Sequence, residues 1–318
     1  MKNTTQFYNN YAKNIAPKLE KLEKERKTYL TIFVAISIVS ALLFSILFAG
    51  PFILVIISAE GNSLQGSTLL FGLAILAFSL IPPTGISYLI ISKIFSKKIK
   101  TSCMKNILAT FDNLNLSDNG TSLISDYDIC RSRLFESYNT RQDDDCFCGS
   151  YKDTEFKIIE TILLNIRESN QKRQHCTVFK GIILSFHSHK TIKGHTVITS
   201  KGDFSAHGKL QKVTLEDAEF NKKYNISSTD QIESRYLITT SFMERFKNLH
   251  TAFGSANTKC SFFDDKVIFA IPTSKNLFEL GNLFCSLKNQ EPINQFYKEI
   301  TAVYDIIDYF KLAEKTGL

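Results

Sequence analysis

Two long apolar runs divide the N-terminal third of the chain. The first run spans residues 29–59 and the second spans residues 67–92. A helix needs about 20 apolar residues to cross the hydrocarbon layer of a membrane, and both runs are longer than that. Glu60 is the only acidic or basic residue between positions 28 and 92. The pattern therefore predicts a transmembrane hairpin over residues 29–92 rather than a pair of buried core helices.

A cleaved signal peptide is the alternative interpretation of the first run. The apolar core of a signal peptide has about 7–15 residues and follows a short basic region. Here the apolar run is much longer, and a polar region of 28 residues precedes it. In that region, Phe7, Tyr11, Ile15 and Leu19 recur at helical spacing. We therefore expect a cytoplasmic N-terminal helix over residues 1–28 and a hairpin that is retained.

The pattern changes twice after the hairpin. Residues 93–143 predict a basic flank and a mostly helical linker, and residues 144–318 predict a separate cytoplasmic domain. In that domain we expect a strand–turn–strand unit over residues 146–166, helices within 230–253, a hairpin over 259–272 and a last helix over 294–315. This order favours an α+β fold with a mainly antiparallel sheet and a C-terminal helix.

The net charge of +7 comes from the flanks of the apolar runs. Residues 1–28 carry seven Lys or Arg and three Glu, whereas residues 101–318 carry 27 basic and 27 acidic side chains. Electrostatic capture of nucleic acid needs a clustered basic surface on the folded domain. Because the domain is neutral, we expect no nucleic-acid partner.

The same distribution predicts an orientation in the membrane. The second run is followed by Lys93, Lys97, Lys98 and Lys100, and the connection over residues 60–66 has no Lys or Arg. Positive charge stays on the cytoplasmic side, so both termini should lie in the cytoplasm. Each flanking lysine near the bilayer attracts anionic headgroups by about 1 kcal/mol. A bilayer with anionic lipids is therefore the first expected partner.

Two pairs of side chains are candidate metal ligands. Cys146 and Cys148 form a C-x-C pair, and His187 and His189 are spaced in the same way. On a strand, residues i and i+2 lie on one face, so two such pairs on neighbouring strands offer four ligands. The chain has seven cysteines and no second C-x-C or C-x-x-C, and cytoplasmic cysteines are reduced. We expect no bound cofactor or metal, and these four residues are the candidates should a metal bind.

The polar stretch over residues 227–246 allows two interpretations. Asp230, Glu233 and Arg235 either form a binding pocket or are polar residues at the capped end of a helix. Asp230-x-x-Glu233 fits a capping box, which would leave Ile232 and Tyr236 on the buried face of that helix. Arg235 has no acidic partner at i±4. We name Asp230, Glu233 and Arg235 as the candidate binding residues.

The segment from Val213 to Phe246 resembles the signature of a bacterial membrane family known as domain of unknown function 3137. The matching positions are Leu215, Glu216, Asp217, Phe220, Asp230, Gln231, Arg235, Tyr236, Thr239, Phe242, Met243, Glu244 and Arg245. Thr240 departs from the pattern, which favours proline at that position. The resemblance implies an inner-membrane protein with a cytoplasmic domain and a LemA-type membrane protein as a partner. It implies no activity.

Three classes of function are compatible with these patterns. The leading expectation is a non-enzymatic, membrane-anchored module that binds a protein or a lipid headgroup. The second is a membrane-proximal enzyme with a pocket around Asp230 and Arg235, and the third is a transporter subunit or membrane-inserting effector. The chain has no GxSxG nucleophile elbow and no phosphate-cradling glycine-rich loop, which favours the first class.

Overall fold

The computed structural model describes most of the chain and divides it into two compact units. The described residues are 7–9, 11–58, 66–111, 113–169, 172–189, 191–203, 210–253, 255 and 257–310, and some side chains, most of them between residues 44 and 83, lie outside the description. Unit 1 comprises Met1–Ile107 and Leu280–Pro292, and unit 2 comprises Leu108–Glu279 and Ile293–Leu318. The predicted outward-facing connection falls almost entirely on residues 59–65, which are not described.

Unit 1 is built on two long helices. A π-helical turn, η1 (Tyr11–Ile15), leads into α2 (Ala16–Ser58), and α3 (Gly66–Leu108) follows. Each α-helix has 43 residues, which corresponds to about 65 Å of length. Pro17 lies in the first turn of α2, directly after the π-helical turn.

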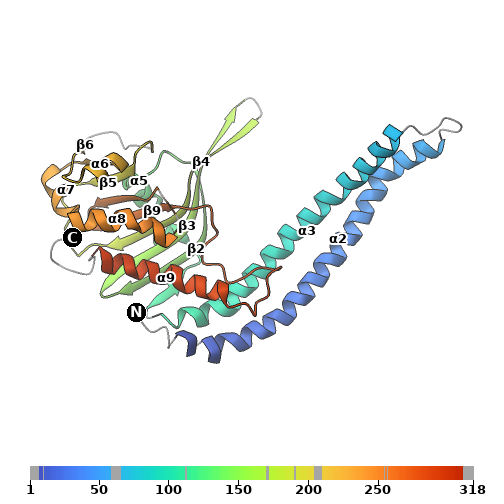
Figure 1. Ribbon diagram of the computed structural model, residues 1–318, viewed down its shortest axis with the longest axis horizontal. Helices are drawn as coiled ribbons and strands as arrows, with labels where there is room; N and C mark the ends of the chain where they lie inside the picture. The colour runs from blue at the N-terminus through green and yellow to red at the C-terminus, as the bar shows by residue number, and fades with distance from the viewer. Residues whose placement is uncertain are drawn as a thin grey trace. The chain divides into compact units, whose positions relative to one another are not determined.

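The two helices run antiparallel and side by side (Figure 1). Lys98 Nζ lies 2.8 Å from Glu25 Oε2, and the rings of Tyr29 and Phe95 are 5.5 Å apart. Lys98 is therefore paired with Glu25, whereas Lys93 and Lys97 are exposed.

Near their polar ends these helices bury a line of apolar side chains. Along their apolar runs, many apolar side chains are exposed. Buried residues at helical spacing are Phe7, Tyr11, Ile15, Leu19 and Leu22 before the first run and Phe95, Ile99, Cys103, Met104 and Ile107 after the second. Exposed residues include Ile32, Val34, Ile36, Ile38, Val39, Leu42, Leu43, Ile46, Ile86, Leu89 and Ile90. Among the described residues, the stretch Phe7–Leu43 is the one helix long and apolar enough to cross a membrane, a property of membrane anchors and of signal sequences alike.

Unit 2 contains one antiparallel sheet. Its strands are β1 (Leu114–Leu116), β2 (Thr140–Tyr151), β3 (Thr154–Ser169), β4 (Lys172–His187), β5 (Thr196–Ser200), β6 (Gln211–Val213), β7 (Tyr224–Ser228), β8 (Lys259–Phe263) and β9 (Lys266–Pro272). Within the described part of the chain these nine strands pair in the order β1-β2-β3-β4-β9-β8-β5-β7-β6. The predicted hairpins β2–β3 and β8–β9 are confirmed.

The helices of unit 2 are short except for the last two. They are α4 (Gly120–Leu123), α5 (Asp126–Arg131), α6 (Ala218–Lys223), α7 (Gln231–Leu237) and α8 (Thr240–Phe253), together with α9 (Glu291–Tyr309), which begins two residues before unit 2 resumes. The α+β class, the antiparallel sheet and the C-terminal helix are thus confirmed. Residues 101–143 are less helical than predicted, because β1 and the start of β2 occupy part of that stretch.

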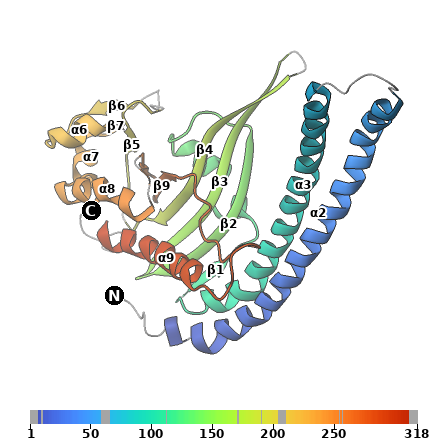
Figure 2. The same ribbon diagram turned by 45° about the vertical axis from the view of Figure 1, so that its right-hand side comes forward.

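Both faces of the sheet are covered. On one face, Ile124, which follows α4, and Ile129 of α5 pack against Ile159, Ile183 and other strand residues. On the opposite face lie α8 and α9, drawn in orange and red in Figure 2. Phe310 follows α9, and its ring lies 5.1 Å from that of Phe269 on β9. Alternating strand residues therefore fill two cores, which holds the loops between the strands in fixed positions.

The loop after β9 is held by two buried carboxylates. Glu160 on β3 accepts a hydrogen bond from Leu277 N at 3.3 Å, and Glu299 on α9 accepts one from Phe278 N at 2.7 Å. Burial raises the pKa of Glu299 above its usual range. These carboxylates satisfy backbone donors that would otherwise be buried without a partner.

Candidate functional site

Asp230 is the N-cap of α7. Its Oδ1 atom accepts hydrogen bonds from Ile232 N and Glu233 N, each at 2.9 Å, and its backbone is extended. Aspartate is favoured at this position because it satisfies amide donors of the first turn and carries a charge that suits the helix N-terminus. Asp230 is therefore committed to local structure.

Glu233 has a different task from the one its spacing predicts. Its two carboxylate oxygens accept hydrogen bonds from Lys193 N at 2.8 Å and Gly194 N at 2.5 Å. A Cβ atom at Gly194 would lie 2.7 Å from Glu233 Oε2 and 3.0 Å from Asp230 Cβ, so a larger residue here would displace the Glu233 carboxylate. Glu233 binds the turn before β5 instead of completing the capping box, because that turn offers two adjacent amide donors.

Arg235 faces a small cavity on the surface of unit 2. Its Nη1 atom donates to Gln231 O at 3.0 Å, within its own helix. The cavity has a volume of about 240 Å³ and is lined by Leu215, Glu216, Arg235, Ile238, Thr239, Thr240 and Met243. Thr239 is also the predicted cap of α8, and its Oγ1 accepts from Phe242 N at 3.2 Å. Of the three candidate binding residues, only Arg235 lines this cavity.

The exposed face of α7 is apolar as well as charged. The side chains of Ile232 and Tyr236 are 70% and 74% exposed, so the prediction that they face the core is wrong. The helix buries Ser234 and Leu237 instead. Because α7 has only two turns, the strip of its surface that packs against the domain is narrow. The side chains of Ile232, Arg235 and Tyr236 all lie outside this strip. In the described part of unit 2, the other large exposed apolar side chains are Leu116 and Tyr127.

The structure does not bring the Cys and His pairs together. Cys148 on β2 pairs with Lys157 on β3, and Lys157 pairs with Ser185 on β4. His187 therefore lies two strands away from Cys148 and two residues further along β4 than Ser185. Two strand spacings amount to about 10 Å, whereas four ligands of one zinc ion lie within about 4 Å of each other.

The individual members of these pairs also have other surroundings. Cys146 is buried, and this burial raises the pKa of its thiol to about 12. His187 Nδ1 lies 3.4 Å from Asp265 Oδ2, and His189 Nε2 lies 3.0 Å from Asp153 O. A thiol that stays protonated is a poor ligand, because zinc binds the thiolate.

A different acidic group forms where β2 has a bulge. The pairing of β2 with β3 shifts between Asp143 and Cys146, and carboxylate oxygens of Asp144, Asp145 and Glu279 then lie within 4.8 Å of one another. Asp144 and Asp145 are adjacent in the sequence, but Glu279 comes from the loop after β9 and carries no local signal. Glu279 Oε1 also accepts a hydrogen bond from Asn276 Nδ2 at 2.6 Å, and exposed acidic groups are common without an ion, so we do not assign the group to a metal.

A buried histidine that the sequence does not single out lies in the core. His195 Nε2 is 3.1 Å from Ser261 Oγ and 3.4 Å from Ser132 O. Burial lowers the pKa of His195 to about 4, so the ring is neutral at physiological pH. Its position away from solvent indicates a structural task rather than proton transfer to a substrate.

The fold and the α7 surface define the protein as a helical pair joined to an α+β domain with an exposed, mixed apolar and cationic helix. Residues 177–312 match the family described as "Protein of unknown function (DUF3137)". This match supports the assignment of these residues to that family, and the resemblance seen in Val213–Phe246 is confirmed.

Two further comparisons add little. No curated protein matches the chain. A crystal structure of the mycobacterial trehalose monomycolate transport factor A, TtfA, is 11% identical and has a TM-score of 0.32, and the match covers 58% of this chain and 92% of that one. A likeness at this TM-score carries no argument about fold or function.

Proposed function

We propose that the protein is a membrane-anchored binding module of the bacterial inner membrane. In this proposal α2 and α3 both cross the bilayer, and both termini and unit 2 lie in the cytoplasm. The exposed face of α7, formed by Ile232, Arg235 and Tyr236, binds a partner protein.

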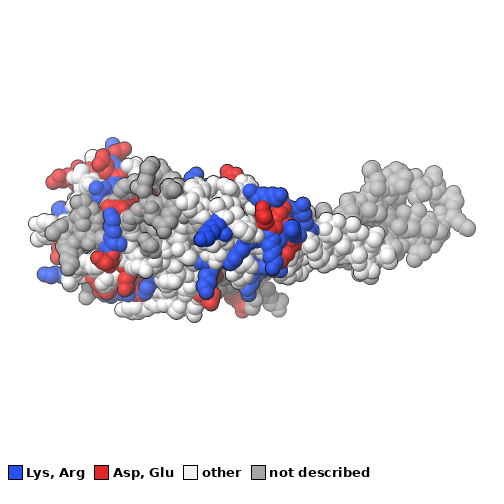
Figure 3. Space-filling view, turned by 90° about the horizontal axis from the view of Figure 1, so that it is seen from below, with Lys and Arg blue, Asp and Glu red and all other residues white. Residues whose placement is uncertain are grey.

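The surface of unit 1 supports the anchor. Large apolar side chains are exposed on α2 from Ile32 to Ile46 and on α3 from Ile86 to Leu89. Contiguous apolar surface of this kind marks contact with a membrane or another protein. Charged side chains gather on the helices next to an uncharged stretch (Figure 3), as expected where a helix enters the headgroup layer.

One observation carries the proposal that unit 2 binds a protein. On the short helix α7, Ile232 and Tyr236 are exposed on both sides of Arg235 in the sequence, and Arg235 lines a cavity. Tyrosine and arginine dominate the energetically important positions of protein interfaces. Burying two apolar side chains of this size contributes roughly 1.5–3 kcal/mol each. The face therefore suits a protein surface better than a dissolved metabolite.

The cavity indicates the chemistry of that partner. Its volume of about 240 Å³ is below the range of about 300–1,000 Å³ that small-molecule sites occupy. It fits one side chain, and its cation and threonine hydroxyls suit a carboxylate directed toward Arg235 and away from Glu216. We infer a partner segment with an acidic residue between apolar ones. A LemA-type membrane protein is the candidate that the family resemblance suggests.

Photocrosslinking in native membranes tests this proposal. A photoreactive amino acid replaces Tyr236 in the full-length protein, and the same substitution at the exposed Tyr127 is the matched control. We expect a defined protein product from position 236 and none from position 127. Arg235→Glu should weaken the interaction by about 2 kcal/mol, roughly thirtyfold, because an interface arginine is lost and replaced by a like charge to the partner.

A cap variant separates binding from folding. Asp230→Ala removes the N-cap and should cost about 1 kcal/mol of stability, whereas Arg235→Ala should change stability by no more than about 0.5 kcal/mol because its side chain is exposed. Equal crosslinking from positions 236 and 127, or an undiminished product in Arg235→Glu, contradicts the binding face.

A further inference from the structure

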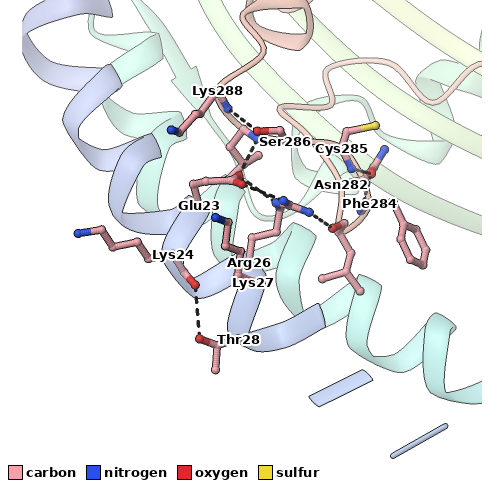
Figure 4. A network of polar contacts seen from close by, with 12 residues as sticks. Glu23, Lys24, Arg26, Lys27, Thr28, Asn282, Phe284, Cys285, Ser286 and Lys288 are labelled. Atoms are coloured by element: carbon pink, nitrogen blue, oxygen red, sulfur yellow. Dashed lines mark hydrogen bonds and ion pairs between the residues drawn. The ribbon is translucent and has the colours of Figure 1, made fainter. Parts of the chain in front are cut away.

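A segment from the far end of the chain packs within unit 1. Residues Leu280–Pro292 belong to the same compact unit as α2 and α3. Arg26 Nη1 donates to Leu283 O at 2.8 Å, and Leu287 N donates to Glu23 Oε2 at 2.9 Å, as Figure 4 shows. Two side chains of α2 thus hold the backbone of this segment at two points.

The two side chains form a buried ion pair. Arg26 Nε and Nη2 lie 2.9 Å and 2.8 Å from the two carboxylate oxygens of Glu23, and the side chains are 10% and 6% exposed. The hydrogen bonds from Arg26 lower the pKa of Glu23 to about 2. Leu280, Leu283 and Leu287 are also buried. The segment is therefore fixed by paired charges, backbone hydrogen bonds and apolar packing together.

The residue that this arrangement leaves outside is a phenylalanine. Phe284 is 56% exposed, and Figure 4 shows it pointing away from the ion pair. Asn282 Oδ1 accepts from Phe284 N at 3.0 Å and from Cys285 N at 2.8 Å, which shapes the turn. The ring of Phe284 stacks on Tyr88 at 5.3 Å and meets Phe33 edge-on at 5.8 Å. An exposed aromatic ring is thus held in one defined place.

The two rings that contact Phe284 show where along the helices its ring lies relative to the flanking lysines. Phe33 lies six residues after Lys27, and Tyr88 lies five residues before Lys93. At 1.5 Å per residue, these rings lie about 9 Å and about 8 Å inside the last flanking lysines. That is the level at which aromatic rings gather between the headgroups and the hydrocarbon layer.

We propose that the turn Asn282–Ser286 is a third membrane contact, in which Phe284 inserts into the interface of an anionic bilayer. Lys24, Lys27 and Lys288 are exposed, and Figure 4 draws them around the ion pair that holds the turn, where they would meet headgroup phosphates. This inference rests on the proposed membrane anchor. It adds that a segment distant in sequence from the two helices lies on the bilayer surface.

The composition of the chain allows a direct test, because it contains no Trp. Phe284→Trp therefore gives a protein with a single tryptophan in vesicles of phosphatidylcholine and phosphatidylglycerol. Lipids brominated at different depths quench tryptophan that lies near them. We expect a blue-shifted emission that shallow bromines quench more than deep ones. Tyr236→Trp is the exposed control and should stay unquenched.

A third variant separates this inference from the anchor. Ile38 is exposed on α2 about 16 Å beyond Lys27, so Ile38→Trp should be quenched by deep bromines if the helix crosses the bilayer. Failure of Ile38→Trp to respond overturns the anchor. Quenching of Ile38→Trp without quenching of Phe284→Trp overturns the interfacial turn alone. So does a tryptophan at position 284 that neither brominated lipid nor aqueous acrylamide reaches, since a protein would then cover it.

Discussion

At the scale of single residues, charged side chains that are close in sequence have separate tasks. Asp230 accepts two amide hydrogen bonds of its own helix, and Glu233 accepts two from the turn before β5. Arg235 bonds only a carbonyl of its own helix among the contacts described, and it lines the cavity. The carboxylates are needed to position α7, which leaves the guanidinium available to a partner.

His195 carries a prediction about pH. Its pKa is lowered to about 4 in the folded protein, compared with about 6.5 when exposed. Between these values the unfolded chain binds more protons, so the free energy of unfolding falls as the pH falls from about 6.5 to 4. We expect His195 to lower the free energy of unfolding by on the order of 3 kcal/mol over this pH range. The His195→Gln variant should lack this contribution.

Thermal unfolding of the full-length protein in detergent, followed from pH 7 to pH 4, measures this difference. The wild-type melting temperature should fall more steeply than that of His195→Gln. Parallel curves for the two proteins would show that His195 is not a neutral core residue.

The sequence predicts residue roles where the cause is local. Asp230 and Thr239 cap helices as predicted, because each acts on amides within three residues. The outward position of Ile232 and Tyr236 was not predictable, because the burial of a two-turn helix depends on which distant elements cover it. The task of Glu233 depends on a turn far away in sequence.

At the scale of elements, contacts between distant segments determine the architecture. The hairpins β2–β3 and β8–β9 follow from alternation and turn residues. The pairing of β4 with β9 joins residues such as Ile183 and Ala270, and no local pattern specifies it. The attachment of Leu280–Pro292 to α2 depends on the backbone of that segment, which side-chain patterns do not reveal.

The Glu23–Arg26 pair should control how firmly that segment is held. Arg26→Ala leaves a buried carboxylate without its partner, which costs about 3–5 kcal/mol, and it removes the donor to Leu283 O. We expect much faster hydrogen exchange of amides in residues 280–290, including Leu287 N. Exchange measured by mass spectrometry in detergent tests this.

Lys24→Ala is the matched control, because Lys24 is an exposed neighbour on the same helix. Its exchange over residues 280–290 should equal that of the wild type. If Arg26→Ala also exchanges at the wild-type rate, the ion pair does not hold the segment.

At the scale of the whole molecule, the account joins an anchor to a binding domain. The apolar runs and basic flanks follow from composition, and the α+β class follows from the order of the predicted elements. The proposed partner surface could not be predicted, since it depends on which side chains the fold leaves exposed. Both parts work together only if unit 2 lies on the side of the membrane that carries the lysine-rich flanks.

Reporter fusions to the full-length protein test this central claim most directly. Green fluorescent protein folds in the cytoplasm, and alkaline phosphatase is active only after export. We predict fluorescence from fusions at both termini, and phosphatase activity only from an insertion in the connection over residues 60–66. An active phosphatase at the C-terminus would contradict the account, because the α7 face would then lie outside the cell.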